Sequence, residues 1–307
     1  MLTFKAHKKP ISGLAFAPDG RHLATSARHE GARLWDLDGP TEVQQYPGFT
    51  FDGLPVAFSP DGRFLALGGY NFDAWELETH ACVGSSRIIA YTVAFAPDSQ
   101  EVAAFGVDEP LERWALPKGK KGKAKKLSGG WGGSRSKNRH QRFPAGAMAY
   151  SPDGKIIATA YAVDTGKGFD SYILLWDRKT GRSRGELVAD FQYDHPAAIA
   201  YSPDGAVIAG IYGPVLGVVD VTNGKKVAAL KPGKKHFKGL AFTPNGKHLI
   251  AVNTDAAVRV YDTATWKETT GYEWQIGKLT AVAVAPDGLR AACGSDRGRV
   301  VIWDLDA

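Results

Sequence analysis

Cysteine and methionine are scarce in this chain, with two residues of each among 307. Cys82 and Cys293 fall in separate repeat units, so a disulfide between them is not expected. Long apolar runs are also missing, since no stretch approaches the ~20 residues that span a bilayer. Three lysines at positions 5, 8 and 9 follow Met1 without the apolar segment of a signal peptide. These absences predict a cytoplasmic protein that contacts no membrane.

Recognisable catalytic and metal-binding motifs are absent as well. The sequence contains no Gly-x-Ser-x-Gly, Gly-x-x-x-x-Gly-Lys, His-Glu-x-x-His or Cys-x-x-Cys, and its eight histidines are dispersed without metal-ligand spacing. Asp164 and Asp170 lack the ordered series of acidic and amide residues that forms a calcium loop. We therefore expect no enzymatic activity, no cofactor and no bound metal.

A repeated pair of short motifs runs through the whole chain. Seven times a Pro-Asp-Gly tripeptide, or a close variant, is followed 15 to 24 residues later by Trp-Asp or a degraded copy of it. The turn copies begin at Pro18, Pro60, Pro97, Pro152, Pro203, Pro244 and Pro286, and the second motif begins at Trp35, Trp75, Trp114, Trp176, Val219, Tyr261 and Trp303. Four of the six intervals between successive prolines are 37 to 42 residues long. This is the period of a four-stranded propeller blade.

Short apolar runs on both sides of each turn predict β-hairpins. Proline presets φ at the first corner of a tight turn, and glycine tolerates the positive φ that the turn requires. The run before each turn has alanine at its centre, as in Leu14-Ala15-Phe16. Alternate side chains of such a strand give one bulky face and one small face, as expected near the crowded axis of a ring. No apolar period of 3.6 residues persists over three turns, so the chain is predicted to be all-β.

The first unit carries a resemblance to a known family. Residues 6–7 (Ala-His), 11–20 (Ile-Ser-Gly-Leu-Ala-Phe-Ala-Pro-Asp-Gly) and 34–36 (Leu-Trp-Asp) match the pattern of WD40-repeat proteins. The chain resembles that family, and its bacterial members in particular, over its full length. The resemblance implies a single domain at 1–307 that folds as a seven-bladed β-propeller of four-stranded antiparallel blades. We expect the strand-like segment 2–5 to complete the last blade and to close the ring.

A buried polar network is a further feature of the resembling family. There, a histidine at the place of His7 joins a Ser or Thr, an Asp and a Trp. In this chain Arg28-His29-Glu30 stands where the Asp would be, and Asp296 of the seventh unit faces Gln275 where a His would be. We therefore expect the network to be incomplete in every blade, with apolar packing holding the ring together.

Two units are longer than the others, since 55 residues separate Pro97 from Pro152 and 51 separate Pro152 from Pro203. The extra length lies in a basic insertion at about 117–142 and a longer hairpin loop at about 161–171. The lysines and arginines from 118 to 142 exceed the whole net charge of +6. One hypothesis is that this insertion contacts a nucleic-acid backbone; the alternative is a solvated loop with no specific function. The possible nucleic-acid contacts are Lys120, Lys121, Lys123, Lys125, Lys126, Trp131, Arg135 and Arg139.

The loops that lead into the inner strands, and the opposing hairpin loops, are rich in aromatic and charged side chains. Such residues anchor protein interfaces when the strand pattern does not require their burial. The predicted partner-binding residues on this rim are Phe51, Tyr70, Phe72, Arg87, Arg142, Phe143, Tyr193, His195, His236, Phe237 and Trp274. We interpret the chain as a non-enzymatic scaffold or subunit that binds a protein segment of some acidic character. The alternative is a nucleic-acid-associated subunit.

Overall fold

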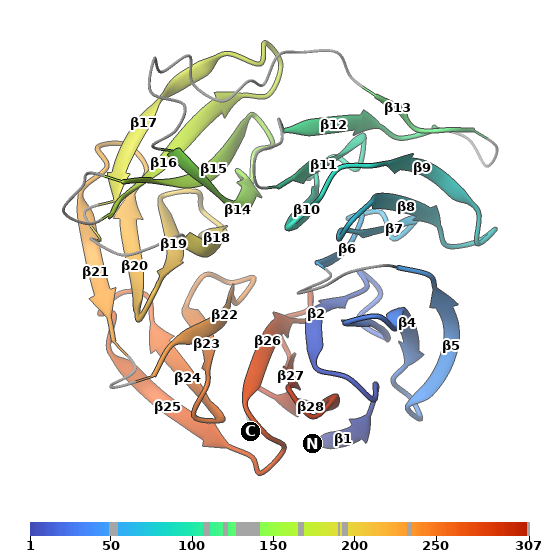
Figure 1. The fold of residues 1–307 in the computed structure, drawn as a ribbon. Helices are drawn as coiled ribbons and strands as arrows, with labels where there is room; N and C mark the ends of the chain where they lie inside the picture. Colours follow the sequence, from blue (N-terminus) through green and yellow to red (C-terminus); the bar gives the residue numbers. More distant parts are fainter. Residues whose placement is uncertain are drawn as a thin grey trace.

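The structure is a computed structural model that describes residues 1–48, 55–106, 111–118, 122–126, 142–164, 169–189, 191, 196–231 and 235–305. Over these residues the chain is all-β and contains no helix. Its strands form seven four-stranded antiparallel sheets, arranged as blades around a central axis (Figure 1). The predicted seven-bladed β-propeller is thereby confirmed.

Each blade runs from an inner strand near the axis to an outer strand at the edge of the ring. Blade 1 is β2 (Ile11–Phe16), β3 (His22–Ala27), β4 (Gly31–Asp36) and β5 (Thr41–Tyr46); blade 2 is β6 (Val56–Phe58), β7 (Phe64–Leu67), β8 (Phe72–Glu76) and β9 (Cys82–Ser86). Blade 3 is β10 (Thr92–Phe95), β11 (Glu101–Phe105), β12 (Glu112–Ala115) and β13 (Lys125–Lys126); blade 4 is β14 (Arg142–Tyr150), β15 (Ile156–Asp164), β16 (Phe169–Asp177) and β17 (Ser183–Ala189). Blade 5 is β18 (Pro196–Tyr201), β19 (Val207–Tyr212), β20 (Val215–Asp220) and β21 (Lys226–Leu230); blade 6 is β22 (Phe237–Phe242), β23 (His248–Asn253), β24 (Ala257–Asp262) and β25 (Glu268–Glu273). Blade 7 is β26 (Leu279–Val284), β27 (Arg290–Ser295), β28 (Arg299–Asp304) and β1 (Leu2–Lys5).

The ring is closed by strands from opposite ends of the sequence. β1 pairs antiparallel with β28, with Leu2 opposite Ile302 and Lys5 opposite Arg299. The two ends of the chain accordingly lie near each other at blade 7 (Figure 1). This pairing gives blade 7 its outer strand and confirms the predicted role of the N-terminal strand.

The Pro-Asp-Gly turns have the geometry that their residues favour. In blade 4, Gly154 has φ +67° and the Asp153 carboxylate accepts the Lys155 backbone N–H at 3.0 Å. The Ser151 hydroxyl donates to Asp153 at 2.7 Å and accepts the Ile156 N–H at 2.9 Å. A positive φ is disfavoured for residues with a Cβ, which explains the glycine in six of the seven turns, with Ser99 in the remaining one.

Apolar side chains fill the space between neighbouring blades. Between blades 1 and 2, for example, Tyr46, Leu65 and Leu67 are each at most 1% exposed and belong to one cluster with Leu34. The central alanine of the inner strand, such as Ala15, is partly exposed in all seven blades. This agrees with the predicted small face near the axis.

Both of the long units contain strand residues within the segments that were expected to be insertions. Lys125 and Lys126, within the predicted basic insertion, form the outer strand of blade 3 and pair with Ala115 and Trp114. In blade 4, β15 continues to Asp164 and β16 begins at Phe169, paired residue by residue. The prediction of a loop at 161–171 is corrected accordingly, because most of this segment is a paired extension of the blade.

Blade 1 contains the buried network that was expected to be incomplete. His7 Nε2 lies 2.8 Å from Thr25 Oγ1, Trp35 Nε1 donates to the same oxygen at 2.8 Å, and His7 Nδ1 lies 3.1 Å from Glu30. The expectation was wrong here because the longer Glu30 side chain does what an Asp does in the family pattern.

The tryptophans at the ends of the third strands in blades 2, 4 and 7 follow a simple rule. Trp176 of blade 4 donates to the Thr159 hydroxyl at 2.8 Å. Thr159 and Thr25 occupy equivalent positions, because each follows by two residues the second-strand residue that pairs with the tryptophan of its blade. Leu67 and Cys293 stand at that register in blades 2 and 7, and there the Trp75 and Trp303 N–H groups are buried without a partner among the described residues. In blades 1, 2, 4 and 7 a threonine at this position therefore decides whether the tryptophan N–H is hydrogen-bonded, whereas in blade 3 the Trp114 N–H donates to Glu112 at 3.3 Å.

Candidate functional site

The ring has two rims that differ in the chain segments they expose. Because adjacent strands run in opposite directions, the connections between blades and the turns between second and third strands lie on one side, which we call the connection rim. The Pro-Asp-Gly turns and the turns between third and fourth strands lie on the other side, which we call the turn rim. The predicted partner-binding residues were expected on the connection rim.

The connection between blades 2 and 3, residues 87–91, exposes an apolar surface on this rim. Ile89 is 42% and Tyr91 50% exposed, and Arg87 beside them is exposed as well. The alternate residues Ile88 and Ala90 are 2% and 1% exposed and pack in the core of blades 2 and 3. The segment therefore behaves as a short extended strand with a buried face and an outward face.

Backbone hydrogen bonds on both sides hold the 87–91 segment in place. Ala90 exchanges two bonds with Gly69 of blade 2, at 2.7 and 2.9 Å, and the Tyr91 N–H donates to Phe105 of blade 3 at 3.0 Å. Gly106 packs so closely that a Cβ there would lie 1.6 Å from the Ile89 carbonyl oxygen. The outward side chains are thus displayed by a fixed backbone, which lowers the entropy that a partner must overcome on binding.

A pocket of roughly 450 Å³ opens on the same rim between blades 6 and 7. Asp255 from the turn of blade 6, Trp274 from the connection and Arg297 from the turn of blade 7 line it. The Trp274 ring stacks on Tyr272 with centroids 5.5 Å apart and also contacts Trp303 at 4.8 Å. The structure therefore brings the predicted residue Trp274 into a preformed hollow that also offers charges of both signs.

Seven further rim predictions fall into three groups. Tyr70 is partly buried and His236 is exposed, both on turns or connections of this rim. Arg142 and Phe143 begin β14, the inner strand of blade 4, and pair with Val163 and Ala162. Phe51, Tyr193 and His195 lie outside the described residues.

Two predicted rim residues belong to the core instead. Phe72 is 0% exposed and lies 6.0 Å, centroid to centroid, from Trp114 of blade 3. Phe237 is 2% exposed and packs with the buried residues of blades 5 and 6. Their assignment to the rim surface is corrected, because both open a strand at the rim yet point between blades.

Three of the possible nucleic-acid contacts lie in the described part of the basic insertion. Lys126 forms an ion pair with Glu112 and lies 5.9 Å from the Trp114 ring centroid. Lys123 donates to the Cys82 carbonyl at 2.9 Å, and Lys125 is exposed. Lys123 and Lys126 thus help to hold β13 in place through contacts with blades 2 and 3. Lys120, Lys121, Trp131, Arg135 and Arg139 lie outside the described residues.

Titratable groups near this surface show no arrangement for metal binding. Among the residues that the structure describes, no three His, Cys, Asp or Glu side chains are grouped so that they could hold an ion. Both cysteines are free, and burial raises the pKa of the Cys293 thiol to about 12. Within the same residues there is no helix long and apolar enough to cross a membrane.

Comparison with known proteins identifies the repeat. Residues 1–36 and 269–304 match the family model for the WD domain, G-beta repeat (WD40). These two segments contain β1 to β4 and β26 to β28, so together they include every strand of blade 7.

The chain is also similar to several curated proteins, some of them named as WD repeat-containing proteins. It is 25% identical to WD repeat-containing protein SL1-17 of Schistosoma mansoni, over 58% of this chain and 54% of that protein. It is 22% identical to the WD repeat-containing protein 26 homolog of Arabidopsis thaliana, over 98% and 50%. The human serine-threonine kinase receptor-associated protein is 21% identical over 98% of this chain and 81% of its own length. The chain thus spans about half the length of the first two relatives. All three are eukaryotic, so the expected resemblance to bacterial members is not supported.

Proposed function

We propose that this chain is a WD40-repeat propeller that works as a protein-interaction scaffold and binds a partner segment on its connection rim. The observation that carries the proposal is the 87–91 segment, in which Arg87, Ile89 and Tyr91 face outward from a hydrogen-bonded backbone. Tyrosine and arginine dominate the energetics of protein interfaces, and exposed apolar side chains beside them supply buried area. The pocket that contains Trp274 lies on the same rim and offers a second anchor point.

The comparisons support a role in binding rather than catalysis. WD-repeat proteins generally bind other proteins, and the relatives named above carry the names of WD-repeat and receptor-associated proteins, not of enzymes. The positive charge of Arg87 favours a partner segment with some acidic character. A cytoplasmic location is part of this proposal.

Capture of partners from the native cell tests the proposal. The bait is the full chain, either unchanged or with Arg87→Glu, Ile89→Asp and Tyr91→Ser together. The control carries Lys247→Glu and Leu289→Asp, which make the same change in net charge on exposed side chains of the turn rim. Proteins recovered by the unchanged bait and the control, and lost with the triple variant, support the proposal. Equal recovery by all three baits contradicts it.

The alternative, a nucleic-acid-associated subunit, is tested in the same experiment by a nuclease arm. The basic insertion supports this alternative through its many lysines and arginines. If nuclease removes the captured proteins and the triple rim variant does not, nucleic acid bridges them. If nuclease has no effect and the rim variant does, the contact is made by protein.

A further inference from the structure

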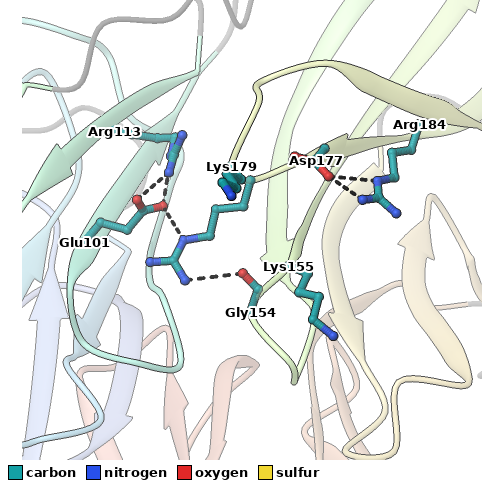
Figure 2. A pocket seen from close by; sticks show the side chains of 8 residues that line it. Glu101, Arg113, Gly154, Lys155, Asp177, Lys179 and Arg184 are labelled. Atoms are coloured by element: carbon teal, nitrogen blue, oxygen red, sulfur yellow. Dashed lines mark hydrogen bonds and ion pairs between the residues drawn. The ribbon is translucent and has the colours of Figure 1, made fainter.

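A second pocket lies on the opposite side of the ring, on the turn rim between blades 3 and 4. Its volume is roughly 660 Å³, and five basic but only two acidic side chains line it. The residues come from β11 and β12 of blade 3, from the Pro-Asp-Gly turn of blade 4, and from the turn between β16 and β17 (Figure 2). The connection rim and its proposed partner do not involve this pocket.

The floor of the pocket is a buried ionic network that joins the two blades. Glu101 accepts hydrogen bonds from Nε and Nη2 of Arg113 and, at 2.8 Å, from the Tyr150 hydroxyl; it also lies 3.1 Å from Arg178. Arg178 reaches across the seam to Asp98 with two bonds of 2.7 and 3.0 Å. These two arginines and two carboxylates neutralise one another, so the floor is rigid and carries no surplus charge.

The surplus positive charge lies around the mouth of the pocket. Lys179 is exposed and has no partner among the described residues. The Lys155 side chain is 76% exposed, and its pairing with Asp153 at 3.1 Å is open to solvent and therefore weak. The Arg184 side chain is 58% exposed and pairs with Asp177. Hydrogen bonds from the Thr180 N–H and from Arg184 lower the pKa of Asp177 to about 2. Asp177 thus stays ionised and orients Arg184 without using all its N–H groups.

The cations are spread out rather than focused on one point. In Figure 2, Lys155 and Arg184 extend to different sides of Asp177, while Arg113 and Glu101 lie across the pocket. An extended chain with several carboxylates therefore suits this arrangement better than a single small anion does. No aromatic ring lines the pocket among the residues that the structure describes, so it lacks the stacking platform on which single-stranded nucleic acids depend.

We propose that this pocket is a second docking site, which binds an acidic peptide segment through Lys155, Lys179 and Arg184. The network of Glu101, Arg113 and Arg178 serves as its preformed base. The peptide lies across the two turns of blade 4, its carboxylates exchanging water for the exposed ammonium and guanidinium groups.

Binding of a fluorescent octaglutamate peptide to the full chain at low salt tests the proposal. The variant is Lys155→Glu with Lys179→Glu. The matched control is Lys247→Glu with Lys267→Glu, which makes the same charge change on exposed residues of the same rim in blade 6. We expect the blade 4 variant to weaken binding about tenfold, because two attractive contacts between lysines and peptide carboxylates become repulsive. We expect the control to weaken binding much less.

Three outcomes overturn the proposal. One is an unchanged affinity in the blade 4 variant, and another is an equal loss in the control, which would reflect net charge alone. The third concerns an oligothymidylate probe. If the blade 4 variant weakens binding of this probe more than it weakens binding of octaglutamate, the ligand is a nucleic acid. A stronger salt dependence for the unchanged chain than for the blade 4 variant supports the direct ionic contact.

Discussion

The buried hydroxyl of Thr25 offers a quantitative test of how blade 1 is held together. Thr25 is 0% exposed, and its hydroxyl accepts from Trp35 and contacts His7, both at 2.8 Å. Valine has nearly the same shape without the hydroxyl, so Thr25→Val removes both hydrogen bonds and opens no cavity. A buried polar group left unpaired costs about 1–3 kcal/mol. The variant leaves two such groups without this partner, the Trp35 N–H and His7 Nε2, so we expect the free energy of unfolding to fall by about 3 kcal/mol.

Thr159→Val in blade 4 is the matched control. Thr159 is also buried, and among the described residues its side chain is hydrogen-bonded to Trp176 alone. We therefore expect Thr159→Val to lower the free energy of unfolding by about 1.5 kcal/mol. Urea unfolding followed by tryptophan fluorescence gives both values, provided that the slopes of the transitions agree. If Thr25→Val costs no more than Thr159→Val, the His7 hydrogen bond contributes nothing and the account of the network is refuted.

Three further predictions concern the rim, blade 7 and pH. Gly106→Ala is expected to reduce partner capture at least as much as Ile89→Asp, because its Cβ would displace the Ile89 carbonyl; Gly39→Ala, with open space around it, should leave capture unchanged. Cys293→Thr should raise the free energy of unfolding by about 1 kcal/mol in urea titrations by giving the Trp303 N–H a partner, and no gain would refute the threonine rule. Burial, with a smaller contribution from Arg33, lowers the pKa of His7. The network's contribution to stability is therefore present above about pH 6.5 and lost as the pH falls below it. The fall in stability between pH 7.5 and 5.5 should be smaller in His7→Gln, and an equal fall would contradict this assignment.

The architecture could be predicted from sequence because the turn signal is local and repeated. A Pro-Asp-Gly turn such as 152–154 forms from its own residues, and seven copies, most of them 37 to 42 residues apart, leave little choice of fold. The network of blade 1 was misjudged for a local reason too. The expectation required an Asp, whereas Glu30 reaches His7 Nδ1 with one more methylene.

The surfaces could be predicted only in part, because exposure depends on neighbouring blades. Arg87 was expected on the rim, but Ile89 and Tyr91 were missed, although buried Ile88 and Ala90 alternate with them. The side-chain period of two in an extended segment, which places Ile89 and Tyr91 on the same face as Arg87, was the available signal. The ionic network of Glu101, Arg113 and Arg178 was not predicted. It depends on the way blades 3 and 4 pack against each other, which places Arg178 3.1 Å from Glu101.

Site-specific photo-crosslinking tests the central claim most directly, namely that the connection rim is the partner-binding surface. A photoreactive phenylalanine analogue is introduced in the native cell at Ile89, at Tyr91 or, as a control, at Leu289 on the turn rim, all three of which are exposed. The account predicts that positions 89 and 91 crosslink to the same protein and that position 289 does not. Crosslinking of that protein at 289 alone, or no crosslink at either rim position, would contradict it.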